Sequence, residues 1–174
     1  MTTDSDTRAL IKELGLVPAD SFEAADLPAK NLGPEELIDI LEKLGYSCKT
    51  YVEGYIFIYD SGRMVMLDYK YLPRLTFYYI FPFKDRREDL ENVFSVLNDI
   101  NLTWFMVKAF LDSKEENIVL NLVAVHEDTA SFSRNAECYV EHIMNAAKTF
   151  EEQYDKCRLA RMLAGFRNEA ARAS

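Results

Sequence analysis

Apolar residues recur at helical spacing in three segments of the chain. The first, residues 34–45, opens with Pro34 and two glutamates and reaches Gly45, which are helix start and stop signals. The second spans 85–101, and the third is a long segment that Ser131 can cap. Their apolar positions are Leu37, Ile40, Leu41 and Leu44; Leu90, Val93, Phe94 and Leu97; and Phe132, Ala136, Tyr139, Val140, Ile143, Ala147, Phe150 and Tyr154. This spacing predicts three amphipathic helices.

Runs rich in β-branched and aromatic residues predict strands between these helices. Five runs span residues 55–59, 64–69, 75–83, 102–111 and 117–125, and a further run at 48–52 leads to Gly54, which we interpret as a bulge or break. The sequences DSGR and DSKEEN predict hairpin turns, the first with Gly62 at its tip. Short connections favour antiparallel pairing. We therefore predict an α+β fold with a mostly antiparallel five-stranded sheet, in the order α-β-β-β-α-β-β-α.

The run TFYYIFPF at residues 76–83 raises the question of what covers the sheet. A strand with one face in water alternates apolar and polar residues, but this run does not. One set of alternating side chains carries no charge and is expected to form the core beneath the helices: Leu75, Phe77, Tyr79, Phe81 and Phe83, with Val65, Leu67, Tyr69, Phe105, Val107, Ala109 and Leu111. The opposite set is rich in Met, Tyr and Trp: Met64, Met66, Asp68, Thr76, Tyr78, Ile80, Trp104, Met106, Lys108 and Phe110.

This second apolar set predicts an interaction surface. Large exposed apolar patches often mark binding sites, methionine adapts to varied partners, and Trp and Tyr are frequent hot spots. We expect protein binding at Met64, Met66, Tyr78, Ile80, Trp104, Met106 and Phe110. The alternative is that the N-terminal arm or the end of the last helix folds over the same face, and the pattern leaves both open.

Composition narrows the class of protein. The 174 residues are 49% hydrophobic, which is typical of a globular chain. Their net charge is −9, whereas nucleic-acid binders usually carry a basic stripe. Three cysteines without a C-x-x-C motif favour reduced thiols. The N-terminus has no apolar signal region, and no apolar run approaches the ~20 residues of a membrane helix. We expect a cytoplasmic protein without nucleic-acid or membrane partners.

Three parts follow along the chain. Residues 1–33 read as an arm, with a short helix at 5–14 and a proline-containing linker, and 34–155 form the α+β domain. Residues 156–174 are a basic helical extension and tail with an apolar stripe at Leu159, Met162, Leu163 and Phe166. This extension can dock on a partner, another subunit or a membrane surface, or its cations simply suit the negative end of a helix.

The chain offers little that points to catalysis or metal binding. His126, Cys138 and His142 are ligand types, but neither a fourth ligand nor a known zinc spacing accompanies them, so we interpret them as a buried thiol and two surface histidines. No G-x-S-x-G elbow and no glycine-rich phosphate loop occurs. We expect no cofactor, no metal and no enzymatic activity.

The segment from Pro34 to Phe150 resembles the YbjN-like domain family, bacterial proteins whose fold is similar to that of type III secretion chaperones. LEKLGYSCKT is similar to the family's opening helix, which ends in leucine, glycine and an aromatic residue before a strand. VFSVLNDINLTWFMVKAFLD is similar to its second helix, with an asparagine near the end. The resemblance implies a chaperone-like α+β fold, a homodimer, and a role in protein binding or in stress and regulatory physiology. It implies no catalytic residues.

These observations together predict a non-enzymatic protein-binding module, chaperone-like or regulatory, that acts through the apolar sheet face or the long C-terminal helix. The alternative is a small-ligand-binding regulatory domain, with the ligand held between the sheet and the arm.

Overall fold

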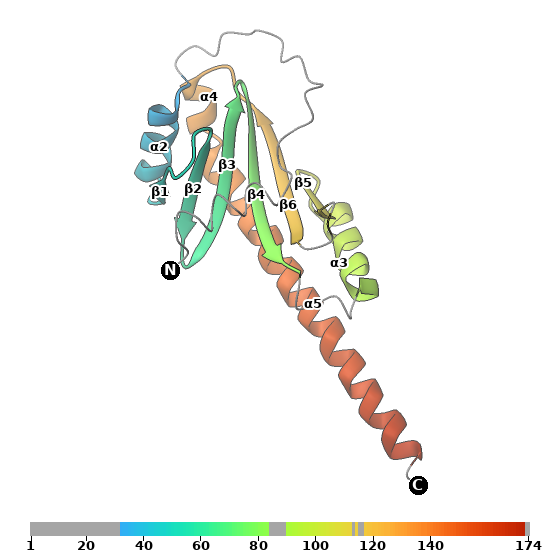
Figure 1. Ribbon diagram of the computed structural model, residues 1–174. Coiled ribbons are helices and arrows are strands. Elements are labelled where there is room, and N and C mark those ends of the chain that lie inside the picture. The colour runs from blue at the N-terminus through green and yellow to red at the C-terminus, as the bar shows by residue number, and fades with distance from the viewer. Residues whose placement is uncertain (1–31, 84–89, 113, 115–116, 173–174) are drawn as a thin grey trace.

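The computed structural model describes residues 32–83, 90–112, 114 and 117–172 (Figure 1). The helix expected at 5–14 lies outside these residues, as do three of the six residues of the second hairpin turn. In chain order the elements are α2 (Pro34–Lys43), β1 (Ser47–Lys49), β2 (Tyr55–Asp60), β3 (Arg63–Tyr71), β4 (Arg74–Pro82), α3 (Leu90–Thr103), β5 (Val107–Leu111), β6 (Asn117–Val125), α4 (Thr129–Ser133) and α5 (Ala136–Arg172).

The strands form one sheet in the order β1-β2-β3-β4-β6-β5, and every neighbouring pair is antiparallel. The predicted α+β class and antiparallel sheet are confirmed. The predicted number of five strands is wrong, because Ser47–Lys49 pairs with β2 as a sixth strand. The chain leaves that pairing before Gly54, whose φ of +88° suits a turn between two strands.

The turn between β2 and β3 is the predicted hairpin. Asp60 pairs with Arg63, so the loop has two residues. Ser61 and Gly62 have φ values of +48° and +81°, the positive angles that a two-residue type I′ turn requires. This tight turn sets the register in which β2 and β3 alternate their side chains.

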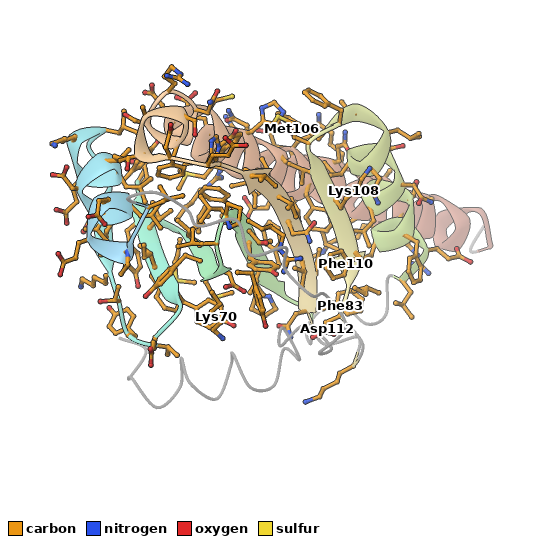
Figure 2. All side chains as sticks on the ribbon, turned by 90° about the horizontal axis from the view of Figure 1, so that it is seen from above. Lys70, Phe83, Met106, Lys108, Phe110 and Asp112 are labelled. Carbon is orange, nitrogen blue, oxygen red and sulfur yellow. The ribbon has the colours of Figure 1, made fainter. Side chains whose placement is uncertain are left out.

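The main core lies between the sheet and helix α5. Figure 2 shows α4 and α5 along one side of the sheet, and no described helix against the opposite side. Aromatic rings join the two layers, because Phe81 lies 5.2 Å from Phe150 and Phe77 lies 5.7 Å from Tyr139 between ring centroids. Arg63 on β3 adds a polar tie by donating to the Met144 carbonyl at 3.3 Å.

The side chain of Asn101 closes the outer edge of β5. Its Nδ2 donates to the Ala109 carbonyl and its Oδ1 accepts from the Ala109 amide, both at 2.8 Å. These two bonds imitate a neighbouring strand, because an unpaired edge offers one donor and one acceptor at alternate residues. The edge is therefore blocked at the middle of β5 by helix α3.

Residues 102–106 do not form the strand that the sequence predicted. Helix α3 continues to Thr103, and local bonds then form the turn, from the Trp104 amide to Ile100 at 2.9 Å and from the Val107 amide to Trp104 at 2.9 Å. The predicted alternation fails here, since period-two parity holds only inside a strand. Phe105, expected in the core, is 78% exposed, and Trp104 and Met106 pack against the main core on the helix side.

The start of the last helices also corrects a prediction. Asp128, and not Ser131, is the cap residue, and its carboxylate accepts from the Ser131 amide at 2.7 Å. The helix that it caps, α4, is short, and the long helix α5 begins separately at Ala136. Both residue types suit a cap, so the sequence pattern alone chose the wrong one.

Candidate functional site

The side of the sheet opposite α5, which we call the second face, is the candidate site. Its side chains follow from the strand register, being those that alternate with the main-core residues. They are Tyr55, Phe57, Tyr59, Met64, Met66, Asp68, Arg74, Thr76, Tyr78, Ile80, Lys108, Phe110, Val119, Asn121, Val123 and Val125. The middle of this face is apolar, with polar groups around it.

An aromatic and methionine cluster forms the middle of the second face. Tyr55, Phe57 and Met66 are buried together, and Tyr51, Val52, Tyr59, Met64, Tyr78 and Ile80 pack around them. The register places Phe57 opposite Met66, and Met66 opposite Tyr78, so the three span neighbouring strands. Burial, followed by the negative charge of Asp68, raises the pKa of Tyr78 to about 12. The Tyr78 hydroxyl is therefore neutral and acts as a hydrogen-bonding group in an apolar setting.

A polar group borders this cluster at the end of β3. Lys70 donates from Nζ to the Tyr55 hydroxyl at 2.9 Å, and the same Nζ lies 4.0 Å from the centre of the Tyr55 ring. Burial raises the pKa of the Asp68 carboxyl, although the Lys70 amide donates to it at 3.0 Å. Burial on this largely apolar face therefore disfavours the charged form of Asp68, and the Lys70 amide partly offsets this effect.

Exposure is uneven across the second face. Val119 on β6 is fully buried, whereas Val123 and Val125 on the same strand and face are 51% and 65% exposed. Phe110, opposite Val119 on β5, is 39% exposed. The face therefore has a buried part around Met66 and Val119 and an open part toward Val123 and Phe110.

Five of the seven predicted binding residues share this face. Met64, Met66, Tyr78 and Ile80 belong to its cluster, and Phe110 lies beside them on β5. Trp104 and Met106 do not, because they precede the strand, and Trp104 packs edge-on against His142 of α5 at 5.0 Å. In Figure 2, Met106 lies toward α5 and Lys70 on the opposite side.

Sequence reasoning left eight members of the face unassigned, namely Tyr55, Phe57, Tyr59, Arg74, Val119, Asn121, Val123 and Val125. Tyr55 and Phe57 on β2 and Val119 on β6 are fully or almost fully buried there. The same period-two alternation, applied to residues 55–59 and 117–125, would have assigned them. Their burial within the second face has no counterpart in the sequence pattern, which treats both faces alike.

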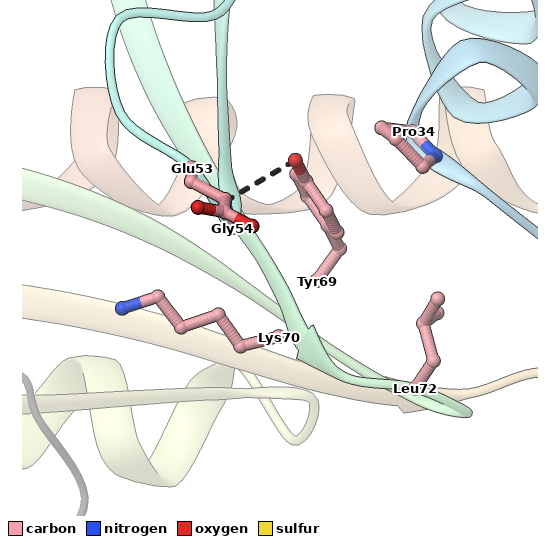
Figure 3. Close-up of a pocket in the computed structure, with 6 residues that line it drawn as sticks. All are labelled: Pro34, Glu53, Gly54, Tyr69, Lys70 and Leu72. Carbon is pink, nitrogen blue, oxygen red and sulfur yellow. Dashed lines mark hydrogen bonds between the residues drawn. The ribbon is translucent and has the colours of Figure 1, made fainter.

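A shallow hollow adjoins the second face (Figure 3). Its volume is about 620 Å³, and it is lined by Pro34, Glu53, Gly54, Tyr69, Lys70 and Leu72. The Gly54 amide donates to the Tyr69 hydroxyl at 3.2 Å, and the Lys70 side chain passes so close to Gly54 that an added Cβ would collide with it. Glycine is therefore required at this point of the wall.

The three candidate metal ligands do not come together as a site. His126 is buried and held by Ser131 Oγ at 3.1 Å and the Tyr139 hydroxyl at 2.9 Å. Cys138 is exposed, and His142 contacts the ring of Trp104. The interpretation as a buried thiol and two surface histidines is wrong for Cys138 and His126, whose burial is reversed. Within the described residues, no three His, Cys, Asp or Glu side chains are grouped as metal ligands.

The contact between Ser131 and His126 is structural. Ser131 Oγ donates its proton to the Asp128 carbonyl at 2.9 Å, which leaves its oxygen to accept from His126 Nδ1. The Tyr139 hydroxyl then donates to Nε2, and the neutral imidazole links the loop before α4 to helix α5. Burial lowers the pKa of His126 in agreement with this neutral form.

Two solved structures are similar to this chain. No protein-family model matches the chain, and no curated protein sequence does. YbjN from E. coli is 20% identical with a TM-score of 0.49, over 67% of this chain and 93% of that chain. A chain of the HopA1–SchA chaperone–effector complex is 17% identical with a TM-score of 0.44, over 66% of this chain and 91% of that chain. None of the helices within the described ranges is long and apolar enough to span a membrane.

We predict that His126 makes folding pH-dependent. Its folded-state pKa lies below the ordinary value of 6.5, so below pH 6.5 the unfolded chain binds a proton that the folded chain resists. The contribution of His126 to the free energy of unfolding should therefore decline as the pH falls from 6.5, and it should level off below the folded-state pKa. His126→Gln keeps polar atoms but cannot titrate, so it should flatten this slope in urea denaturation. Identical slopes for the two proteins between pH 7 and pH 5 would contradict the prediction.

Proposed function

We propose that this chain is a non-enzymatic protein-binding module, chaperone-like or regulatory, and that its second face is the binding surface. One observation carries the proposal. A cluster of aromatic and methionine side chains occupies a sheet face against which no described helix lies, and it continues to exposed apolar residues on β5 and β6. Such surfaces bind extended or helical protein segments by burying apolar area.

The proposed contact residues are those of the cluster and its open margin. Met64, Met66, Tyr78, Ile80 and Phe110 are joined by Val123 and Val125, which are more than half exposed. Because Asn101 blocks the edge of β5, a partner would lie across the face and would not extend the sheet at Ala109. Binding then depends on side-chain burial more than on backbone pairing.

The hollow beside Gly54 is a weaker candidate for a small-ligand site than the second face is for a protein-binding site. Ligand sites bring several polar groups together in a concave pocket. Here Glu53 and Lys70 are the charged residues of the described wall, and Lys70 Nζ already donates to Tyr55. We therefore keep protein binding as the proposed function.

We further propose that two copies of the chain pair through the projecting part of α5. The helix continues from Tyr154, the last buried residue among its described side chains, to Arg172, and Leu159, Met162 and Leu163 are 50–57% exposed along it. A helix without packing is marginal in water, so this stripe favours a partner. Acidic Glu151, Glu152 and Asp155 precede basic Lys156, Arg158 and Arg161, so antiparallel pairing would place opposite charges side by side.

Substitutions on the open margin should test the binding surface. Phe110→Asp with Val123→Asp should reduce capture of specific partners from a lysate of the encoding organism about tenfold or more, because apolar anchors carry most interface energy. The matched control is Leu102→Asp on helix α3, where the side chain is 83% exposed and away from the second face. Tagged proteins and quantitative mass spectrometry provide the measurement. Equal capture by all three proteins would reject the second face as the binding surface.

Sedimentation should test the pairing through α5. Leu159→Asp with Leu163→Asp should convert a dimer to a monomer of 20.1 kDa at micromolar concentration, because the charges would be buried in the paired stripe. Ala164→Asp is the matched control, since Ala164 is exposed on another side of the same helix. A monomeric unmodified chain, or a dimer that both variants keep, would show that the stripe does not pair.

A further inference from the structure

The buried part of the second face lacks a visible cover. In this one-chain structure Val119 is 0%, Met66 2% and Thr76 6% exposed. Neighbouring strands shield a side chain from beside but not from above, and Val123 on the same strand is 51% exposed. No described helix lies above these residues (Figure 2). Tyr51 and Val52 pack on the cluster around Met66, but the described elements leave the burial of Val119 and Thr76 unexplained.

The sequence outside the described residues identifies a cover for them by elimination. Residues 84–89 are KDRRED, all charged, and the remaining short gaps contain Ser113, two glutamates, Ala173 and Ser174. Residues 1–31 alone offer large apolar side chains: Leu10, Ile11, Leu14, Leu16, Val17, Phe22 and Leu27. We propose that residues 1–31 dock on the second face of their own chain.

The point where this segment joins the fold suits the proposal. Leu32 is 3% exposed in the main core, and Pro34 lines the hollow together with Gly54 and Lys70 at the margin of the second face. From β3 to β6 the face is two strand spacings wide, about 10 Å. A chain of 31 residues reaches roughly 100 Å when extended, so it can cross this face even with a helical turn or two.

The chemistry of the segment complements the face. Leu10, Ile11 and Leu14 would form one stripe if 5–14 is helical, as the sequence predicts. The segment has six acidic and three basic residues, while Lys70 and Lys108 on the described strands provide positive charge at the margins of the face. The apolar stripe therefore matches the apolar centre of the face, and Lys70 and Lys108 can pair with acidic residues of the segment.

If residues 1–31 dock in this way, they occupy part of the binding surface of their own chain. Residues 1–31 would cover the cluster around Met66 and leave Phe110 and Val123 open to a partner. A partner that needs the whole face would have to displace the segment. Its apparent affinity would therefore fall in proportion to the fraction of molecules whose face is uncovered. This last step rests on the proposed function, whereas the docking itself does not.

Photocrosslinking in the full-length chain can test the docking. Tyr78 is replaced by p-benzoylphenylalanine, an aromatic residue that reacts with carbon–hydrogen bonds in contact, and the products are mapped by mass spectrometry. We expect crosslinks from position 78 to residues 1–31 within a single chain. Ile80, which packs on the same cluster, offers a second probe position if the first variant does not fold, with the same expected products. The same probe at Phe105, which is 78% exposed on the turn after α3, should give no crosslink to that segment.

Matched variants in the segment strengthen the test. Leu10→Asp with Leu14→Asp should reduce the crosslink about tenfold or more, because docking would bury two charges. Lys12→Asp reverses a charge on the opposite side of the expected helix and should leave the yield unchanged. Crosslinks only to a second copy, only to a co-purifying protein, or to no part of 1–31 would overturn the proposal. Equal partner capture by the face variants would reject the proposed function but would leave this crosslinking result untouched, so the two proposals fail separately.

Discussion

The sheet is built from strands that are apolar on both faces, and one long helix can cover only one of them. Helix α5 covers the face of Phe77 and Phe81 through ring contacts, and Arg63 ties β3 to the same helix. The remaining face keeps a cluster of Tyr55, Phe57 and Met66 that would cost considerable free energy in contact with water. The architecture thus requires a second cover, and the proposals for partner and N-terminal segment both answer this requirement.

The two faces also differ in how firmly they are held. The helix side combines ring packing, the Arg63 tie and the neutral His126 link to Tyr139, which together fix α5 along the sheet. The second face holds polar groups at its border, where Lys70 lies on Tyr55 and Asp68 is buried with a raised pKa. A segment bound on the apolar centre would meet these polar groups at its margin. The blocked edge at Ala109 prevents that segment from joining the sheet as a strand.

Period-two and helical spacing predicted the α+β class, the DSGR hairpin and the faces of β3 and β4, because these depend on local patterns. The same patterns failed at residues 102–106, because the backbone amides there donate within helix α3 and the turn that follows it and do not pair with a neighbouring strand. Trp104 and Phe105 were therefore exchanged between core and surface. The cap at Asp128 was also missed, since Asp and Ser are equally suited to that role. Burial of Val119 depends on residues far away in sequence and could not be read from the pattern of its own strand.

The central claim is that one side of the sheet supports folding while the other supports binding. The most direct measurement compares the unfolding free energies of Phe77→Ala and Phe110→Ala by chemical denaturation. Phe77 is 0% exposed beneath α5, and its replacement should cost about 3–5 kcal/mol. Phe110 is 39% exposed on the second face, and its replacement should cost less than about 1 kcal/mol. Equal losses for the two variants would contradict the division of roles between the faces.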